Sequence, residues 1–127
     1  MRMVLLVGLV AALATSCTPP TTARSSRDPN VITSDELVAS QATNAFDAIR
    51  RLRPNFLTSR GVTTLRGADT GYPRVYLDRV LFGDLNSLKN LSVNGIREIH
   101  YYNGPEASGR FGLDNVSGAI EVISAAR

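Results

Sequence analysis

The first thirty residues constrain this 127-residue chain most, because they cannot contribute to a folded core. Arg2 precedes a run of apolar and small residues that ends before Cys17, which is the layout of a secretory signal peptide. The run is shorter than the roughly 20 apolar residues that a membrane-spanning helix needs. Residues 18–29 then contain three prolines and almost no apolar side chains, as a flexible tether does. The sequence predicts a signal peptide at 1–16, a tether at 17–30 and a folded domain at 31–127.

Cys17 is the only cysteine, so an internal disulfide is impossible. It follows the segment Leu13–Ser16, which resembles the lipobox of bacterial lipoproteins, although that motif usually has leucine at the position of Ala14. In that family the cysteine thiol takes a diacylglycerol and becomes the new N-terminus after cleavage. The resemblance implies a lipid anchor on Cys17, and Thr18 in place of aspartate favours the outer membrane. The alternative is an ordinary secretory signal, cleaved after residue 16 or nearer Ala23.

The charge of the chain is nearly balanced. Arg2 leaves with the signal peptide, so 13 of the 14 basic residues remain against 11 acidic ones, and the mature net charge is +2. A mildly basic chain lacks the electrostatic footprint of a nucleic-acid-binding protein. Arg50, Arg51 and Arg53 are the main local concentration. We expect them to be solvated at a helix C-terminus, where cations suit the helix dipole; a contact with anionic lipid is the alternative.

Capping and breaker residues divide the domain into short elements. Thr33 and Glu36 can form a capping box, Asn44 offers a second cap, and Pro54 stops the helix before it. Side chains alternate between the two faces of a strand, which predicts that Ile99 points into the core. In the first half we expect an edge strand at 30–33, helices at 34–40 and 45–52, strands at 56–58 and 62–65, and a loop at 66–73. In the second half we expect a strand at 74–81, a helical segment at 85–91 opened by Asp84 or Asn86, a strand at 96–102, a turn at 103–105 and a closing strand at 119–124. In the strand at 96–102, Tyr101 is expected to point inward, and Glu98 and His100 outward.

This order, with short connections, predicts the fold class: an α+β domain with a mixed β-sheet and short helices packed on it. A domain of this size lies near the lower limit for folding without disulfides or metal. Its core is expected to contain the apolar residues that recur on one face of each element: Phe46, Ile49, Leu52, Val75, Leu77, Leu88, Leu91, Ile99, Ile120 and Val122.

Five short motifs follow one another in the second half. They are Val75-Tyr76-Leu77-Asp78, Leu85-Asn86-Ser87-Leu88, the segment 96–107 with Gly104-Pro105, Arg110-Phe111-Gly112, and Gly118-Ala119-Ile120-Glu121-Val122. In this order they resemble the plug domain of TonB-dependent outer-membrane receptors, and residues 32–37 and 45–49 are similar to the early helices of that family. The resemblance covers about residues 31–127 and implies a small plug-like fold.

The resemblance implies structural roles for the motif residues rather than chemistry. Gly104 and Pro105 make a tight exit from a strand. Gly112 and Gly118 let the following loop return close to the sheet, and Phe111 is an apolar anchor.

Two departures from the family bear on function. In the receptors the plug fills a transmembrane β-barrel, whereas this sequence stops at Arg127 directly after the last plug-like strand, and no convincing TonB box is present. Arg79 also stands where the family commonly has glycine after the aspartate. We therefore expect this chain to share the fold and the cellular compartment of the family, but not its transport activity.

The residue inventory offers little for catalysis. His100 is the only histidine, the only thiol is expected to be acylated, and residues 104–109 lack the lysine of a phosphate-binding loop. Ser108 and Ser117 have no histidine partner for a triad, and no metal-ligand cluster is visible. We expect no enzymatic activity, no metal or other cofactor and no nucleic-acid partner, and no small-molecule ligand can be inferred.

The expected function is a lipid-anchored, periplasm-facing binding or adaptor module of the outer membrane, with a protein partner. The contact is expected on segment 104–118, where Glu106, Arg110 and Asn115 surround Phe111, since arginine and aromatic residues are enriched at binding hot spots. Alternatively, Phe111 packs inward and Arg110 is merely solvated. Two other interpretations of the chain are a non-functional remnant of a receptor and a small hydrolase.

Overall fold

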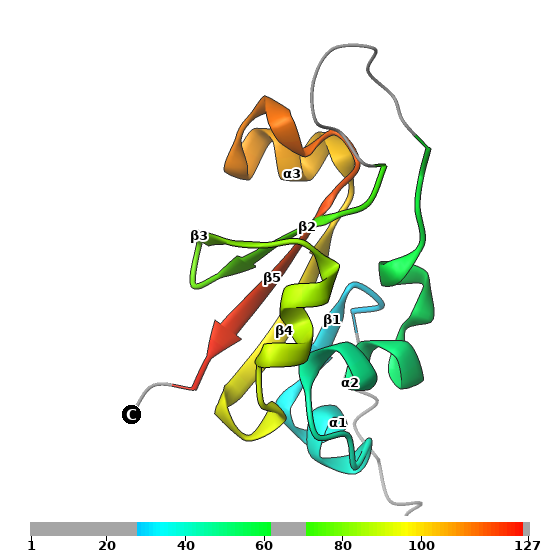
Figure 1. Ribbon diagram of the computed structural model, residues 1–127, viewed down its shortest axis with the longest axis vertical. Helices are drawn as coiled ribbons and strands as arrows, with labels where there is room; N and C mark the ends of the chain where they lie inside the picture. The colour runs from blue at the N-terminus through cyan, green and yellow to red at the C-terminus, as the bar shows by residue number, and fades with distance from the viewer. Residues whose placement is uncertain (1–27, 62–70, 126–127) are drawn as a thin grey trace, which may run out of the picture.

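The structure, a computed structural model, describes residues 28–61 and 71–125. They form one mixed sheet in the order β1-β4-β5-β2-β3, with short helices packed on it (Figure 1), which confirms the predicted α+β class. β2 is parallel to β5, and the other neighbours are antiparallel. The strands are β1 (Val31–Thr33), β2 (Arg74–Leu77), β3 (Val80–Gly83), β4 (Ile96–Tyr102) and β5 (Ala119–Ser124).

Several predictions fall on residues outside the described part. They are the signal peptide, Cys17, the tether up to Arg27, the strand at 62–65 and most of the loop at 66–73. The last three residues of the predicted tether are described and belong to the domain. The Pro29 carbonyl oxygen accepts a hydrogen bond from Arg53 Nε at 3.3 Å, and the Asn30 carbonyl oxygen accepts one from the Tyr101 amide at 2.8 Å.

The two predicted N-terminal helices form as their caps indicate. α1 (Ser34–Ala39) begins with a reciprocal capping box between Thr33 and Glu36. α2 (Ala45–Leu52) begins at Asn44, whose side-chain oxygen accepts the Asp47 amide at 2.9 Å. Each cap satisfies an amide that has no partner inside its helix.

The main core lies between these helices and one face of the sheet. Of the predicted core, Ile49, Val75, Leu88, Ile99, Ile120 and Val122 are buried, and Phe46, Leu52, Leu77 and Leu91 are half-buried against them. Phe56 and Tyr101 complete the core with stacked rings, 4.8 Å between centroids. The predicted faces of the strands are therefore confirmed.

The predicted single strand at 74–81 is wrong, because the chain turns back at Asp78 and Arg79 into the β2–β3 hairpin. Their φ angles are 47° and 72°, so both central residues are left-handed, as in tight hairpin turns that usually contain glycine. Asp78 is held by Ser124, whose amide and hydroxyl donate to its carboxylate at 2.9 and 2.6 Å. β3 lies at the edge of the sheet.

Two other predicted elements are of a different type in the structure. Phe56 and Leu57 belong to a 3₁₀ helix, η1 (Pro54–Leu57), rather than to a strand at 56–58; Pro54 at its first position fixes φ and needs no amide partner. The helical segment after Asp84 is confirmed, but it is a 3₁₀ helix, η2 (Leu85–Asn90), followed by η3 (Val93–Gly95).

The predicted turn at 103–105 is wrong, because a helix begins there: α3 (Gly104–Phe111), followed by the 3₁₀ turn η4 (Leu113–Asn115). Asn103 and Glu106 form a second capping box. Tyr76, Ala107 and Ala119 are buried between α3 and the sheet face opposite the main core, with Tyr102 and Phe111 half-buried beside them. Figure 1 shows α3 at one end of the sheet, away from α1 and α2.

Candidate functional site

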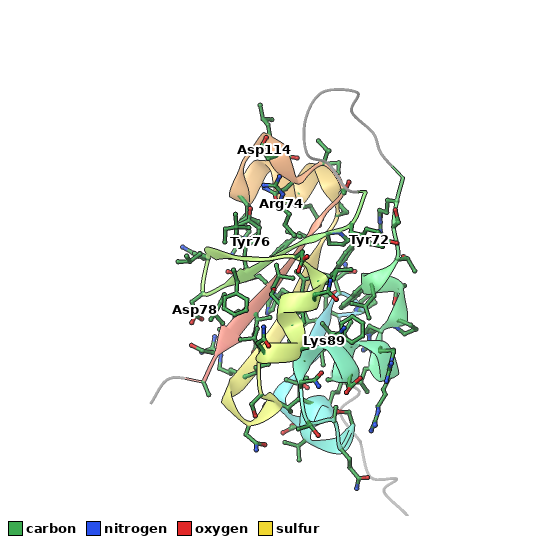
Figure 2. The ribbon with its side chains drawn as sticks, in the orientation of Figure 1. Tyr72, Arg74, Tyr76, Asp78, Lys89 and Asp114 are labelled. Carbon is green, nitrogen blue, oxygen red and sulfur yellow. The ribbon has the colours of Figure 1, made fainter. Side chains whose placement is uncertain are left out.

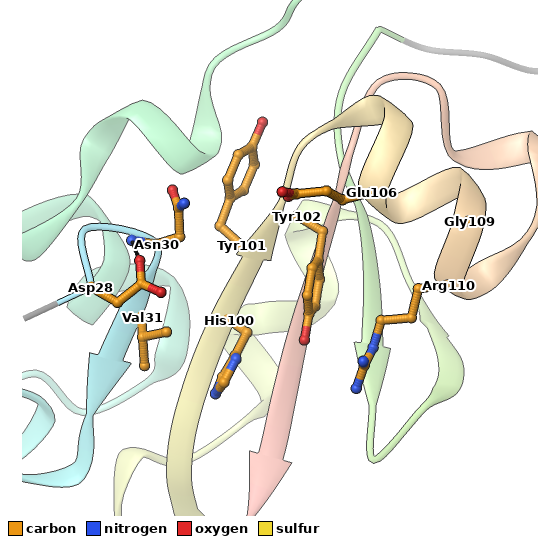
Figure 3. Close-up of a pocket in the computed structure, with 9 residues that line it drawn as sticks. All are labelled: Asp28, Asn30, Val31, His100, Tyr101, Tyr102, Glu106, Gly109 and Arg110. Carbon is orange, nitrogen blue, oxygen red and sulfur yellow. Dashed lines mark hydrogen bonds between the residues drawn. The ribbon is translucent and has the colours of Figure 1, made fainter.

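A shallow groove runs between α3 and the start of β1, across β4 (Figure 3). Its volume is about 570 Å³. The residues from the three elements are Asp28, Asn30 and Val31 at the β1 end, His100, Tyr101 and Tyr102 on β4, and Glu106, Gly109 and Arg110 on α3. The groove thus combines acidic, basic and aromatic side chains on one side of the molecule.

The register of β4 supplies one part of the groove. Successive strand residues face opposite sides, so His100 and Tyr102 share a face while Ile99 is buried in the main core. His100 Nε2 lies 2.9 Å from Glu98 Oε2, two residues away on the same face. The prediction that Glu98 and His100 point away from the core is confirmed.

α3 supplies the other part, and it carries two of the three predicted contact residues. Glu106 and Arg110 are four residues apart and exposed, so they lie on the same side of the helix. Glu106 is fixed by the capping box: Oε2 accepts the Asn103 amide at 3.3 Å, and the Glu106 amide donates to Asn103 Oδ1 at 3.1 Å. The structure therefore brings Glu106 and Arg110 together at the groove.

Arg110 is held by a buried carboxylate. Its Nη2 lies 3.2 Å from Glu121 Oε2, and the Glu121 side chain is only 2 % exposed. The Tyr102 hydroxyl donates to the same oxygen at 2.9 Å, and the guanidinium carbon lies 5.0 Å from the centre of the Tyr102 ring. A buried charge needs such partners, since its desolvation is costly. Arg110 is thus fixed in position, and it is not merely solvated.

The environment of Tyr102 disfavours its ionised form. Burial raises the pKa of the Tyr102 hydroxyl above its ordinary value. The Glu121 carboxylate raises this pKa further, because it accepts a hydrogen bond from the hydroxyl and because it carries a negative charge. Arg110 and Arg79 act in the opposite direction. Tyr102 is therefore a hydrogen-bond donor in this network.

Asn115, the third predicted contact residue, is buried, so the prediction that it contacts a partner is wrong. It is 2 % exposed, its Oδ1 accepts the Tyr76 hydroxyl at 2.9 Å, and its Nδ2 donates to the Gly112 carbonyl at 3.0 Å. Phe111 packs against the Tyr76 ring with 4.0 Å between centroids, as expected of an apolar anchor. Both residues therefore stabilise the packing of α3.

The motif glycines allow close approaches of the backbone. A Cβ on Gly104 would overlap the Val116 carbonyl oxygen, and one on Gly118, where φ is +101°, would lie 2.8 Å from the Tyr102 carbonyl oxygen. The prediction that this segment returns close to the sheet is confirmed. Pro105 lies in the first turn of α3, and Gly112 ends the helix with a φ of +104°. Gly104 and Gly118 are buried, whereas Pro105 and Gly112 are exposed, and all four shape the backbone of the segment.

Tyr102 and Glu121 were not among the predicted contact residues. Alternation along β4 places Tyr102 on the face of His100, so this signal was available. Glu121 lies in an apolar strand, between Tyr76 of β2 and His100 of β4 in the sheet. A carboxylate in a strand is ordinarily expected to face solvent, whereas here it is buried and contacts Arg110 of α3 and Tyr102 of β4.

Within residues 28–61 and 71–125, no three His, Cys, Asp or Glu side chains gather into a group that could hold a metal ion. None of the helices in this part is long and apolar enough to cross a membrane. No protein-family profile, curated protein sequence or solved structure matches the chain.

Proposed function

We propose that the chain is a lipid-anchored binding or adaptor module, attached through Cys17 to the periplasmic side of the bacterial outer membrane. In this proposal the folded part is a stand-alone plug-like domain that contacts a protein partner and does not transport by itself. The lipobox-like segment before Cys17 and the polar, proline-containing stretch after it support the anchor.

The groove between α3 and β4 is the observation that carries the binding role. It places Glu106 and Arg110 beside the Tyr102 ring, and Arg110 forms an ion pair with buried Glu121. Arginine and tyrosine dominate the energetics of protein interfaces, and a side chain fixed before binding loses less conformational entropy on association. The mixed charges of the groove favour a partner surface that also carries both signs.

A pull-down from native membranes tests the groove. Glu106→Arg reverses a charge in the groove, while Asp114→Arg makes the same change at an exposed residue outside it, on η4 beyond α3 (Figure 2). We expect Glu106→Arg to reduce recovery of partner proteins and Asp114→Arg to leave it unchanged. Thermal melting checks that both variants remain folded. Equal recovery with both variants would contradict a contact at the groove, and it is the outcome that a non-functional remnant predicts.

The anchor has its own test, which is independent of the groove. Mass spectrometry of the membrane fraction should find a diacylated Cys17 as the N-terminus. Cys17→Ala should abolish the diacyl modification and cleavage before residue 17; the chain is then released if the signal peptide is cleaved elsewhere, or held by the uncleaved signal peptide with a correspondingly larger mass. Unchanged mass and membrane association in Cys17→Ala would contradict the lipid anchor while leaving a groove contact possible.

A further inference from the structure

Arg79 has a backbone conformation that glycine would adopt more easily. Its φ is 72° and that of Asp78 is 47°, and tight hairpin turns with this geometry prefer Asn-Gly or Asp-Gly. A side chain held in a strained backbone conformation points to a role for that side chain. Asp78 has such a role inside the domain, since it accepts two hydrogen bonds from Ser124.

No comparable contact explains Arg79. Its side chain is exposed, and no hydrogen bond or ion pair joins it to another residue in the described part of the chain. The guanidinium group therefore adds nothing visible to the packing of the hairpin. The residues that surround Arg79 on the surface indicate the role of its side chain.

Arg79 lines a cleft of about 440 Å³ together with Tyr76, Arg110 and Phe111. The stacked rings of Tyr76 and Phe111 provide its aromatic part, and the two guanidinium groups provide its charge. Arg110 is the residue that this cleft shares with the groove, and Arg79 does not line the groove. The cleft thus adjoins the groove and lies between α3 and the β2–β3 turn.

The residues that line the cleft carry two guanidinium groups and no carboxylate. Buried Glu121 contacts one nitrogen of Arg110, at 3.2 Å. A guanidinium group has five N–H donors arranged in a planar fork, so Arg110 keeps donors for a further acceptor and Arg79 keeps all of its own. Carboxylate and phosphate groups match this fork with paired hydrogen bonds.

We propose that Arg79 and Arg110 together bind an oxyanion group, a carboxylate or a phosphate, with the adjoining part of the ligand against Phe111 and Tyr76. This site goes beyond the proposed partner contact, because Arg79 takes no part in the groove. It also gives a reason for arginine at a turn position that would be less strained with glycine.

NMR of the arginine Nε–H groups tests the proposal on the full chain in a neutral detergent. Inorganic phosphate and acetate are titrated in separate experiments. We expect the signals of Arg79 and Arg110 to shift together with one apparent Kd, and the anion with the lower Kd identifies the preferred oxyanion. Arg79→Gly should weaken binding by about tenfold or more, since one of the two forks is lost.

Arg50→Ala is the matched control, because it removes one exposed cation from α2 and leaves the cleft intact. It should bind both anions as the wild type does. Arg79→Gly suits the turn, so its loss of binding is not a loss of folding, and thermal melting checks this. Absence of shifts at both arginines with either anion at tens of millimolar would overturn the proposal. So would shifts of Arg110 that are equal in wild type and Arg79→Gly.

Discussion

Gly104 and Val116 lie so close that a single methyl group on Gly104 would overlap the Val116 carbonyl oxygen. This approach joins the first turn of α3 to the chain that returns toward β5. It therefore fixes the position of α3, and with it Glu106 and Arg110 at the groove. The groove depends on a glycine that does not line it.

Gly104→Ala and Gly109→Ala should change the stability in opposite directions. At Gly104 the new methyl group meets backbone, which cannot rotate away, and overpacking of this kind costs about 1–3 kcal/mol or more. At Gly109 it meets nothing within 4 Å, and alanine should gain up to about 1 kcal/mol in a helix interior. Urea unfolding measures both. Equal stabilities for the two variants would contradict this placement of α3.

Arg79→Gly should stabilise the hairpin. A left-handed residue other than glycine costs about 1–2 kcal/mol, so removing the strain should raise the free energy of unfolding by about 1 kcal/mol. Asp78→Gly relieves the same kind of strain but loses the two hydrogen bonds from Ser124, and it should not stabilise. A drop in stability for Arg79→Gly would show that the arginine side chain supports the fold.

Stability should fall in acid partly through Asp78. Hydrogen bonds from the Ser124 side chain and amide hold the pKa of the Asp78 carboxyl below its ordinary value of 3.8. A lowered pKa means that the native state favours the ionised form, so this stabilisation is complete above pH 3.8 and is lost as the pH falls through the lower, native-state pKa. The difference in unfolding free energy between wild type and Asp78→Asn should therefore shrink below pH 3.8. A pH-independent difference would contradict this.

The Arg110–Glu121 pair should show energetic coupling. Arg110→Met leaves the buried Glu121 carboxylate without its cation, which is costly, whereas in a Glu121→Gln background the same substitution leaves a neutral amide. A double-mutant cycle should give a coupling of about 1 kcal/mol, since Arg110 is partly exposed and solvent weakens the pair. Additive effects would indicate that the pair contributes nothing to stability.

The elements with explicit start signals were predictable from the sequence. Thr33 with Glu36 and Asn44 with Asp47 marked α1 and α2, and alternation gave the faces of β4 and β5. The β2–β3 turn was missed because Arg79 occupies the position at which a glycine would have indicated a turn. α3 was missed because Gly104, Pro105 and Gly109 indicated a loop, although Asn103 and Glu106 carried a capping signal that the structure uses.

The candidate site was only partly predictable, for a related reason. Glu106 and Arg110 were found because an aromatic residue with charged neighbours is visible in one short segment. Tyr102 and Glu121 lie on separate strands and meet Arg110 only through tertiary packing. Asn115 was misplaced because a polar residue in a predicted loop was expected to be exposed, whereas it satisfies the Tyr76 hydroxyl inside the domain.

Photo-crosslinking in native cells tests the proposed binding role most directly. The crosslinking amino acid is introduced at Gly109, which lines the groove, and as a control at Gly95 in η3, which does not; a side chain at either position meets no atom within 4 Å of its Cβ. The proposal predicts a discrete crosslinked protein from the Gly109 variant, absent from the Gly95 variant and reduced when Glu106→Arg is added. The same products from both positions, or none from Gly109, would contradict a partner contact at this groove.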